Sequence, residues 1–187
     1  MLDKIMKPWI FLYNYYTLKR NHIKYQSDLH IKGKLFIMGN IEIGRNVSIN
    51  SGYKYNPIGG SDRTILFTHG NGKIIIGNNV GISNSAIVAA DNITIEDNVM
   101  IGGNCKIYDT DFHSIKNEHR MQKPDTHIKT APVYIMEGAF IGAHSIILKG
   151  VIIGKHSVIG AGSVVTKSVP DGEIWAGNPA HFIRKVQ

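Results

Sequence analysis

The chain has 187 residues, enough for one domain with a sizeable buried core. Hydrophobic residues make up 43% of the sequence and charged residues 19%, which excludes a disordered chain, and no apolar run approaches the about 20 residues that span a bilayer. The formal net charge is +7, but no nucleic-acid-binding motif accompanies it. The one cysteine excludes an internal disulfide and a multi-cysteine metal site, and it favours a reducing, cytoplasmic compartment.

Residues 3–25 are expected to form an amphipathic helix, with a break or an early turn at Pro8. The apolar residues on one side of this helix are Ile5, Trp9, Leu12 and Tyr16. Five basic side chains and one acid fall in residues 1–25, so this segment can contact an anionic membrane surface, a phosphate-bearing ligand or a partner chain. A solvated helix packed on its own domain is the other reading. We therefore expect a cytoplasmic protein, with contact at the inner face of the membrane as one open role of residues 1–25.

A six-residue spacing of aliphatic residues dominates the rest of the chain. In the C-terminal half the spaced positions are Ile135, Ile141, Ile147, Ile153, Ile159 and Val165. Earlier, with one extra residue near 88–95, they are Ile31, Ile37, Ile43, Ile49, Ile76, Ile82, Val88, Ile95, Ile101 and Ile107. The fourth position after the aliphatic residue is also restricted, as in Ala139, Ser145, Val151, Ser157 and Ser163. Two segments, roughly 51–73 and 109–133, interrupt the spacing.

A period of six residues fits neither a helix of 3.6 residues per turn nor a simple two-residue strand. It predicts a short β-segment and a turn, repeated, with the aliphatic side chain inward and Gly or Asn at the corner, as in Gly77-Asn-Asn79 and Asp97-Asn98. Stacked units bury one continuous core, which predicts an all-β solenoid. An ordinary β-sandwich would show irregular strand spacing instead.

Three regions follow from this pattern. They are an N-terminal helical segment at 1–27, a solenoid domain at 28–169 with a protruding loop at 109–133, and a C-terminal tail at 170–187. Within the tail, residues 179–185 are expected to form a short helix that closes the stack, because an open sheet edge invites aggregation.

Three stretches resemble the hexapeptide-repeat acyltransferases. They are Ile107-Tyr-Asp-Thr-Asp-Phe-His113-Ser, the run from Val133 to Ala143, and Ile159-Gly-Ala-Gly-Ser-Val-Val-Thr-Lys167 followed by Ala176-Gly-Asn-Pro-Ala180. The resemblance is closest to the galactoside/maltose/xenobiotic-type O-acetyltransferases and to those acting on surface polysaccharides. It implies a left-handed parallel β-helix, acetyl-CoA as the donor, a sugar hydroxyl as the acceptor and no metal. It also implies a homotrimer with active sites between neighbouring β-helices.

By this resemblance, His113 is the general base. A sugar hydroxyl becomes a good nucleophile when its proton is removed, and an imidazole can accept that proton near neutral pH. The hydroxyl oxygen would then attack the acetyl-CoA thioester directly. Cys105 falls at a small inward position of the repeat, which predicts a buried structural thiol and no acyl-cysteine intermediate. His119 and His127 share the 109–133 loop and are weaker candidates for lining the acceptor pocket.

The donor site is carried over from the same resemblance onto the C-terminal repeats. A backbone N–H near Gly142 and Ala143 would stabilise the oxyanion. The small residues that would let the pantetheine arm lie close to the backbone are Ala143, Ala161 and Gly162; corner packing also accounts for the last two. The residues expected to meet the phosphates of the nucleotide are Thr166, Lys167 and Arg184. His181 stands where many relatives carry Lys or Arg, which leaves one CoA contact open.

Two carboxylates, Asp109 and Asp111, flank the base in the sequence. A carboxylate there can orient the imidazole or bind the acceptor, or it can simply form a turn. We favour Asp111 for the functional role. Asn84 is expected to hydrogen-bond the acceptor sugar, with a corner asparagine as the alternative.

Other functions stay open at this point. An N-acetyltransferase of an amino sugar, or an enzyme transferring another acyl group, would share this site. A non-catalytic β-helix scaffold is disfavoured by the motif around His113. A γ-type carbonic anhydrase needs three zinc-bound histidines, and the His-x4-His pair of those relatives is missing from the sequence.

Overall fold

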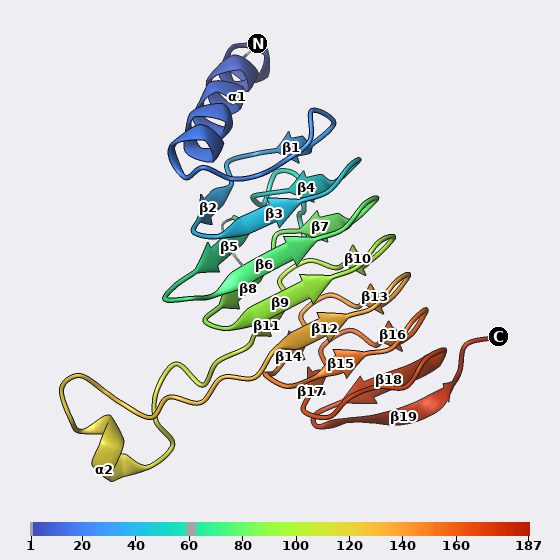
Figure 1. The fold of residues 1–187 in the computed structure, drawn as a ribbon. Helices are drawn as coiled ribbons and strands as arrows, with labels where there is room; N and C mark the ends of the chain where they lie inside the picture. The colour runs from blue at the N-terminus through green and yellow to red at the C-terminus, as the bar shows by residue number, and fades with distance from the viewer. Residues whose placement is uncertain (1, 59–62) are drawn as a thin grey trace.

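The computed structural model describes residues 2–58 and 63–187, with side chains from Pro8 onward in the first segment. The strands form a parallel β-helix in which successive strands occupy three sheets in rotation, so that each turn of the chain adds one strand to each face (Figure 1). Helix α1 (Leu2–Arg20) lies at the N-terminal end of the stack. The short helix α2 (Asn117–Arg120) lies in a loop that projects from the side of the stack.

The three faces are called sheets A, B and C. Sheet A contains β3 (Ile41–Ile43), β6 (Lys73–Ile76), β9 (Asn92–Ile95), β12 (Val133–Ile135) and β15 (Ile152–Ile153). Sheet B contains β1 (His30–Lys32), β4 (Ser48–Asn50), β7 (Gly81–Ser83), β10 (Met100–Ile101), β13 (Phe140–Ile141), β16 (Val158–Ile159), β18 (Glu173–Gly177) and β19 (Ala180–Lys185). Sheet C contains β2 (Phe36–Met38), β5 (Ile65–Thr68), β8 (Ala86–Ala89), β11 (Lys106–Tyr108), β14 (Ile146–Ile147) and β17 (Val164–Val165).

The core is built from columns of aliphatic side chains that run along the axis of the stack. On sheet A, strand pairing places one above another the isoleucines Ile43, Ile76, Ile95, Ile135 and Ile153. All five are buried. Burial of one such side chain contributes about 1.5–3 kcal/mol, so the six-residue spacing is the energetic basis of the fold. The predicted solenoid is confirmed.

Asparagines form several of the corners between sheets. Asn79 and Asn98 have φ of 56° and 62°, the left-handed conformation that Asn tolerates better than most residues, so the turns expected at these positions are confirmed. Their side chains also continue from one turn of the stack to the next. Asn46 Nδ2 donates to Asn79 Oδ1 at 2.9 Å, and Asn79 Nδ2 donates to Asn98 Oδ1 at 3.2 Å.

Two details of the N-terminal half differ from the sequence-based expectation. The helix runs through Pro8 without the expected break and ends at Arg20. In β8 the side chain that enters the core is that of Ile87, which is fully buried, whereas Val88 is half-buried. Strand pairing of Ile87 with Leu66 and Ile107 fixes this register, which a count of six residues from Ile82 misses by one.

The C-terminal tail forms a β-hairpin, so the short helix predicted at 179–185 is wrong. Strand β18 adds to sheet B by pairing in parallel with β16, and β19 then pairs antiparallel with β18. The last open edge of sheet B supplies unpaired backbone groups, and the tail satisfies them with hydrogen bonds between strands. Trp175 packs against the hydrophobic core and covers the end of the stack.

Candidate active site

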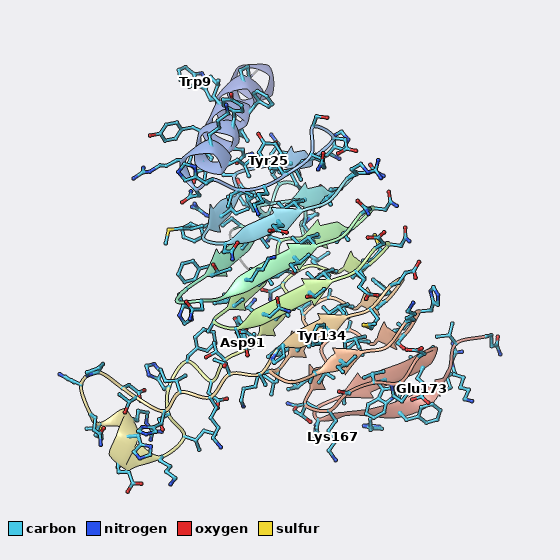
Figure 2. All side chains as sticks on the ribbon, in the orientation of Figure 1. Trp9, Tyr25, Asp91, Tyr134, Lys167 and Glu173 are labelled. Carbon is cyan, nitrogen blue, oxygen red and sulfur yellow. The ribbon has the colours of Figure 1, made fainter. Side chains whose placement is uncertain are left out.

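The second interruption of the repeat forms a loop between β11 and β12, at the corner where sheet C passes into sheet A (Figure 1). A short antiparallel ribbon closes its base. Thr110 pairs with Thr130, and the N–H of Asp111 donates to the carbonyl of Lys129 at 3.1 Å. Asp91, labelled in Figure 2 beside this base, accepts a long hydrogen bond of 3.4 Å from the Thr130 hydroxyl. The loop is therefore held rigidly where it leaves the β-helix.

Asp109 supports the loop from below. Its side chain is fully buried, and its carboxylate accepts the backbone N–H groups of Ala90 at 2.7 Å and Asp91 at 2.9 Å. Burial raises the pKa of the Asp109 carboxyl, and these two N–H donors oppose that shift. The turn-forming reading of Asp109 is the one that these contacts support.

His113 lies on the outer part of the loop, with 71% of its side chain exposed. Its Nδ1 is 3.0 Å from Oδ2 of Asp125, which also accepts the Ser114 N–H at 3.1 Å. Arg120 fixes the same stretch by donating from Nη1 to the Ser114 carbonyl at 2.8 Å. When Nδ1–H is donated to the carboxylate, Nε2 carries the lone pair and is the nitrogen able to take a proton.

The carboxylate beside His113 is thus Asp125 and not Asp111, which corrects the orienting role favoured from sequence. Oδ1 of Asp111 accepts a hydrogen bond from Lys149 Nζ at 2.7 Å, which draws it toward the turn after β14. Binding of the acceptor by Asp111 stays a prediction. Asp125 follows His113 by twelve positions in an irregular loop, and no repeat or motif marks it in the sequence.

His119 and His127 pack together near the tip of the same loop. Their rings stack with centroids 4.2 Å apart. Nδ1 of His127 is also 2.9 Å from the Thr126 hydroxyl. These contacts shape the loop, and a role of either histidine in lining an acceptor pocket stays a prediction.

The residues predicted to hold pantetheine lie on a different edge of the β-helix, where sheet B passes into sheet C. Gly142 and Ala143 follow β13, and Ala161 and Gly162 follow β16 one turn further along the axis. The Gly142 N–H donates to the Ile159 carbonyl at 2.8 Å, so it is already used in stacking. A Cβ on Gly142 would lie 2.6 Å from the Ala161 nitrogen, which explains the glycine. Of the predicted oxyanion pair, Ala143 is therefore the better N–H donor.

Asn84 lies on this same edge, after β7. It is buried, and its Oδ1 accepts the Gly52 N–H at 2.8 Å, which fastens the first interrupting loop to the β-helix. Asn56 and Ile58 of that loop reach Gly103, where a Cβ would lie 2.4 Å from Asn56 Nδ2. Asn84 thus acts as a corner asparagine, and contact with an acceptor stays a prediction.

The residues predicted to meet phosphate separate into two places. Thr166 and Lys167 line a hollow of about 470 Å³ together with His181, so these three side chains lie close enough to act on one ligand. Lys167 projects from the C-terminal end of the stack (Figure 2). Arg184 lies on β19, is exposed, and donates from Nη1 to the carbonyl of Lys185, outside that hollow.

The prediction of a buried Cys105 is confirmed. Its thiol is fully buried beneath the B-to-C edge and donates to the Gly142 carbonyl at 3.2 Å. Burial raises the pKa of the Cys105 thiol, and a thiol that resists ionisation is a poor nucleophile. Within residues 2–58 and 63–187, no cluster of three His, Cys, Asp or Glu side chains is arranged to hold a metal ion.

Comparison with known proteins agrees with this fold. The family model described as bacterial transferase hexapeptide (six repeats) matches residues 132–167, and the model for the hexapeptide repeat of succinyl-transferase matches residues 92–107. None of the curated proteins compared with the chain matches it.

Solved structures resemble the chain over most of its length. A point mutant of AntD, an N-acyltransferase from Bacillus cereus in complex with dTDP and coenzyme A, is 25% identical over 88% of this chain and 83% of its own, with a TM-score of 0.65. The hexapeptide-repeat-containing acetyltransferase VCA0836 from Vibrio cholerae is 26% identical over 88% of this chain and 71% of its own, with a TM-score of 0.55. The same Vibrio protein has also been solved with acetyl coenzyme A, at 22% identity over 92% of this chain and 75% of its own and a TM-score of 0.58.

These findings define the class of the protein. The chain carries hexapeptide repeats of the bacterial transferase type on a left-handed parallel β-helix, the fold of solved acetyltransferases. The predicted repeats and fold are thus confirmed, and the solved neighbours of this fold are acyltransferases, in agreement with the predicted enzyme class. The narrower galactoside, maltose, xenobiotic and surface-polysaccharide groups stay predictions.

Proposed function

We propose that the protein is an acetyl-CoA-dependent O-acetyltransferase that acts on a sugar hydroxyl of a cell-surface polysaccharide or its precursor. The observation that carries this proposal is the pairing of His113 Nδ1 with Asp125 at 3.0 Å on an exposed loop of the β-helix. This geometry leaves Nε2 accessible as a base. Solved neighbours of the same fold bind coenzyme A or acetyl coenzyme A, which supports the choice of donor.

The transfer follows from this arrangement in balanced steps. Nε2 of His113 takes the proton of the acceptor hydroxyl while the hydroxyl oxygen attacks the thioester carbonyl carbon. The oxyanion that forms is stabilised by the Ala143 N–H. When the intermediate collapses, the C–S bond breaks, the thiolate of coenzyme A leaves and the imidazolium returns the proton to it. No acyl group passes through Cys105.

A homotrimer is part of the proposal. The His113 loop leaves at the C-to-A edge, whereas Ala143, Ala161 and Gly162 stand on the B-to-C edge of the same triangular stack. A base and a donor site on two different edges meet if neighbouring copies place one edge against the other around a threefold axis. The active site would then lie between subunits.

We also propose that this reaction takes place at the inner face of the membrane, which residues 1–25 would contact. Helix α1 exposes Trp9 and Phe11, and basic side chains follow them in its last turn. Aromatic and basic side chains together favour the interface of an anionic bilayer. No helix among the described residues is long and apolar enough to cross a membrane.

Thiol release from acetyl-CoA tests the proposed reaction. The wild type and His113→Ala are incubated with hexoses, amino sugars and short oligosaccharides, and acetyl-CoA binding is measured separately. Acceptor-dependent release that His113→Ala abolishes, with donor binding intact, supports the proposal. Absence of acetyl-CoA binding by the wild type would contradict it and favour a non-catalytic scaffold.

N-acetylation of an amino sugar, or transfer of another acyl group, is the second candidate. A specific observation favours it, since AntD is an N-acyltransferase and shares the fold at 25% identity. An amine acceptor needs less help from a base, because its lone pair attacks before the proton is lost. Faster release with amino sugars than with hexoses, and a small effect of His113→Ala, would select this candidate.

A further inference from the structure

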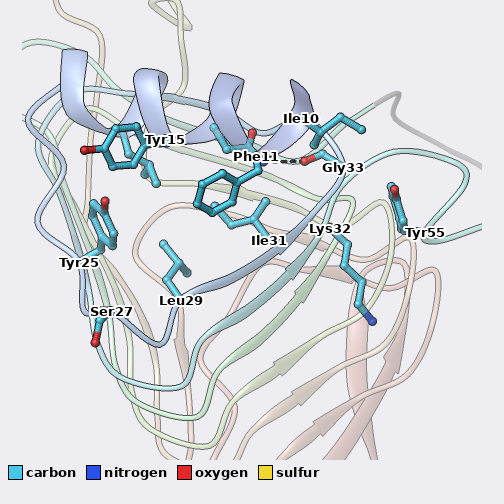
Figure 3. Close-up of a pocket in the computed structure, with 12 residues that line it drawn as sticks. Ile10, Phe11, Tyr15, Tyr25, Ser27, Leu29, Ile31, Lys32, Gly33 and Tyr55 are labelled. Atoms are coloured by element: carbon cyan, nitrogen blue, oxygen red, sulfur yellow. Dashed lines mark hydrogen bonds between the residues drawn. The ribbon is translucent and has the colours of Figure 1, made fainter. Parts of the chain in front are cut away.

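An open apolar groove separates α1 from the first turn of the β-helix. Its volume is about 710 Å³, within the about 300–1,000 Å³ of small-molecule sites, and its walls are mainly apolar and aromatic. Phe11 and Tyr15 face it from α1, and Leu29 and Ile31 face it from the opposite wall (Figure 3). Phe11 keeps 68% of its surface exposed, so the groove holds uncovered apolar area.

The groove is open because hydrogen bonds fix the distance between α1 and the first turn of the β-helix. Asn14 is buried, donates from Nδ2 to the Gly33 carbonyl at 2.9 Å and accepts the Leu35 N–H at 3.1 Å. Figure 3 shows the first of these as a dashed line. Leu18 anchors the next turn of α1 in the core. Because Asn14 and Leu18 hold α1 in place, Phe11 and Tyr15 remain separated from the β-helix by the width of the groove.

Two lysines lie along the groove, and the residues that line it include no acidic side chain. Lys32 belongs to the groove wall, and Lys19 Nζ lies 5.3 Å from the centre of the ring of Tyr15, which also lines the groove. The surface therefore offers an apolar slot with positive charge at its rim.

We infer that this groove binds one acyl chain of an anionic phospholipid, with the phosphate held by Lys32. Apolar walls favour a hydrocarbon chain, and Lys32 in a lining without acidic side chains favours a negative headgroup. A second copy of the chain is a poorer occupant, because it would bring the same positive rim against this one. The inference rests on the proposed contact of residues 1–25 with a membrane and is independent of acetyl transfer.

Two glutamate substitutions on the same helix test the groove. Phe11→Glu places a carboxylate inside it, whereas Tyr16→Glu makes the same charge change at a similarly exposed residue (64%) that lines a hollow on another side of α1. Binding is measured by co-sedimentation with phosphatidylcholine vesicles that contain or lack phosphatidylglycerol. Calorimetry with monomeric dioctanoyl phosphatidylglycerol measures lipid binding to the groove in the absence of a bilayer.

We expect the wild type to bind the phosphatidylglycerol probes, Phe11→Glu to weaken binding by about tenfold or more, and Tyr16→Glu by less than about threefold. Equal losses in the two variants, or no preference of the wild type for phosphatidylglycerol, would overturn the inference. So would a drop in oligomer mass caused by Phe11→Glu, since the groove would then hold a second copy. Acetyl-CoA binding and transfer to a soluble acceptor are expected to be unchanged in Phe11→Glu, and they report on the proposed reaction separately.

Discussion

At the scale of single residues, the pair His113 and Asp125 carries the proposed chemistry. The carboxylate accepts Nδ1–H, so the imidazole keeps the tautomer in which Nε2 is the base. Asp125→Asn would present an amide N–H to Nδ1 and favour the opposite tautomer. We expect kcat to fall by about tenfold to a hundredfold while the affinity for acetyl-CoA is unchanged.

Glu118→Gln is the matched control for this prediction. Glu118 belongs to the same loop, and its carboxylate approaches His119 rather than His113. Steady-state kinetics of both variants decide the question. If Asp125→Asn keeps full kcat, or if both variants lose the same activity, then Asp125 does not orient the base.

Cys105 supplies a second prediction at this scale. Burial raises the pKa of the thiol, so the folded state favours the protonated form, which iodoacetamide does not attack. The resulting stability is present below the ordinary thiol pKa and is lost as pH rises through the folded-state pKa. At pH 8 we expect alkylation of the native protein to be at least about a hundredfold slower than in urea.

Turnover by Cys105→Ala completes this prediction. Because the thiol is buried and packs under the Gly142 carbonyl, we expect the variant to keep its acetyl transfer. A folded Cys105→Ala protein that binds acetyl-CoA but has lost transfer would point to an acyl-cysteine intermediate.

At the scale of elements, β8 shows why register needs the partner strands. A count of six residues places Val88 inward, but pairing with β5 and β11 places Ile87 there. Ile87→Ala should lower the free energy of unfolding by about 2–5 kcal/mol, because it leaves a cavity in a fully buried site. Val88→Ala should cost about 1 kcal/mol or less.

Urea denaturation of the two variants measures this difference. The two substitutions are adjacent in one strand, and Ile87→Ala removes only one carbon more than Val88→Ala, so each serves as the control for the other. A larger loss for Val88→Ala than for Ile87→Ala would restore the register that the six-residue count implies.

At the scale of the whole molecule, the His113 loop and the predicted donor residues lie on two different edges, and the proposed trimer would bring them together between copies. A variant that lacks the base, His113→Ala, and one with a blocked donor edge, Ala161→Trp, should each be inactive. After the two are unfolded together and refolded as a mixture, a site between subunits can combine the intact loop of one chain with the intact edge of another. We expect about a quarter of wild-type activity to return in an equal mixture, as random pairing in a symmetric oligomer gives.

The oligomer mass accompanies this complementation test. Sedimentation should give about three times the 20.7 kDa of the chain. A mixture that stays inactive although mixed oligomers form would mean that base and donor meet within one chain.

The sequence by itself determined the solenoid. A six-residue spacing of aliphatic side chains, with Asn at corners such as Asn79, is a local pattern, and only stacked turns bury such residues on one side. The buried Cys105 followed from the same register, and the exposed loop around His113 followed from its interruption.

The tertiary structure decided the features that depend on partners far apart in the chain. Asp125 was found beside His113 because the fold of an irregular loop, which has no period, brings them together. The tail became a hairpin because sheet B ends in an open edge. The sequence of residues 179–185 does not indicate that this edge is present. The groove under α1 exists because Asn14 forms hydrogen bonds with Gly33 and Leu35. The sequences of the two segments do not predict this contact.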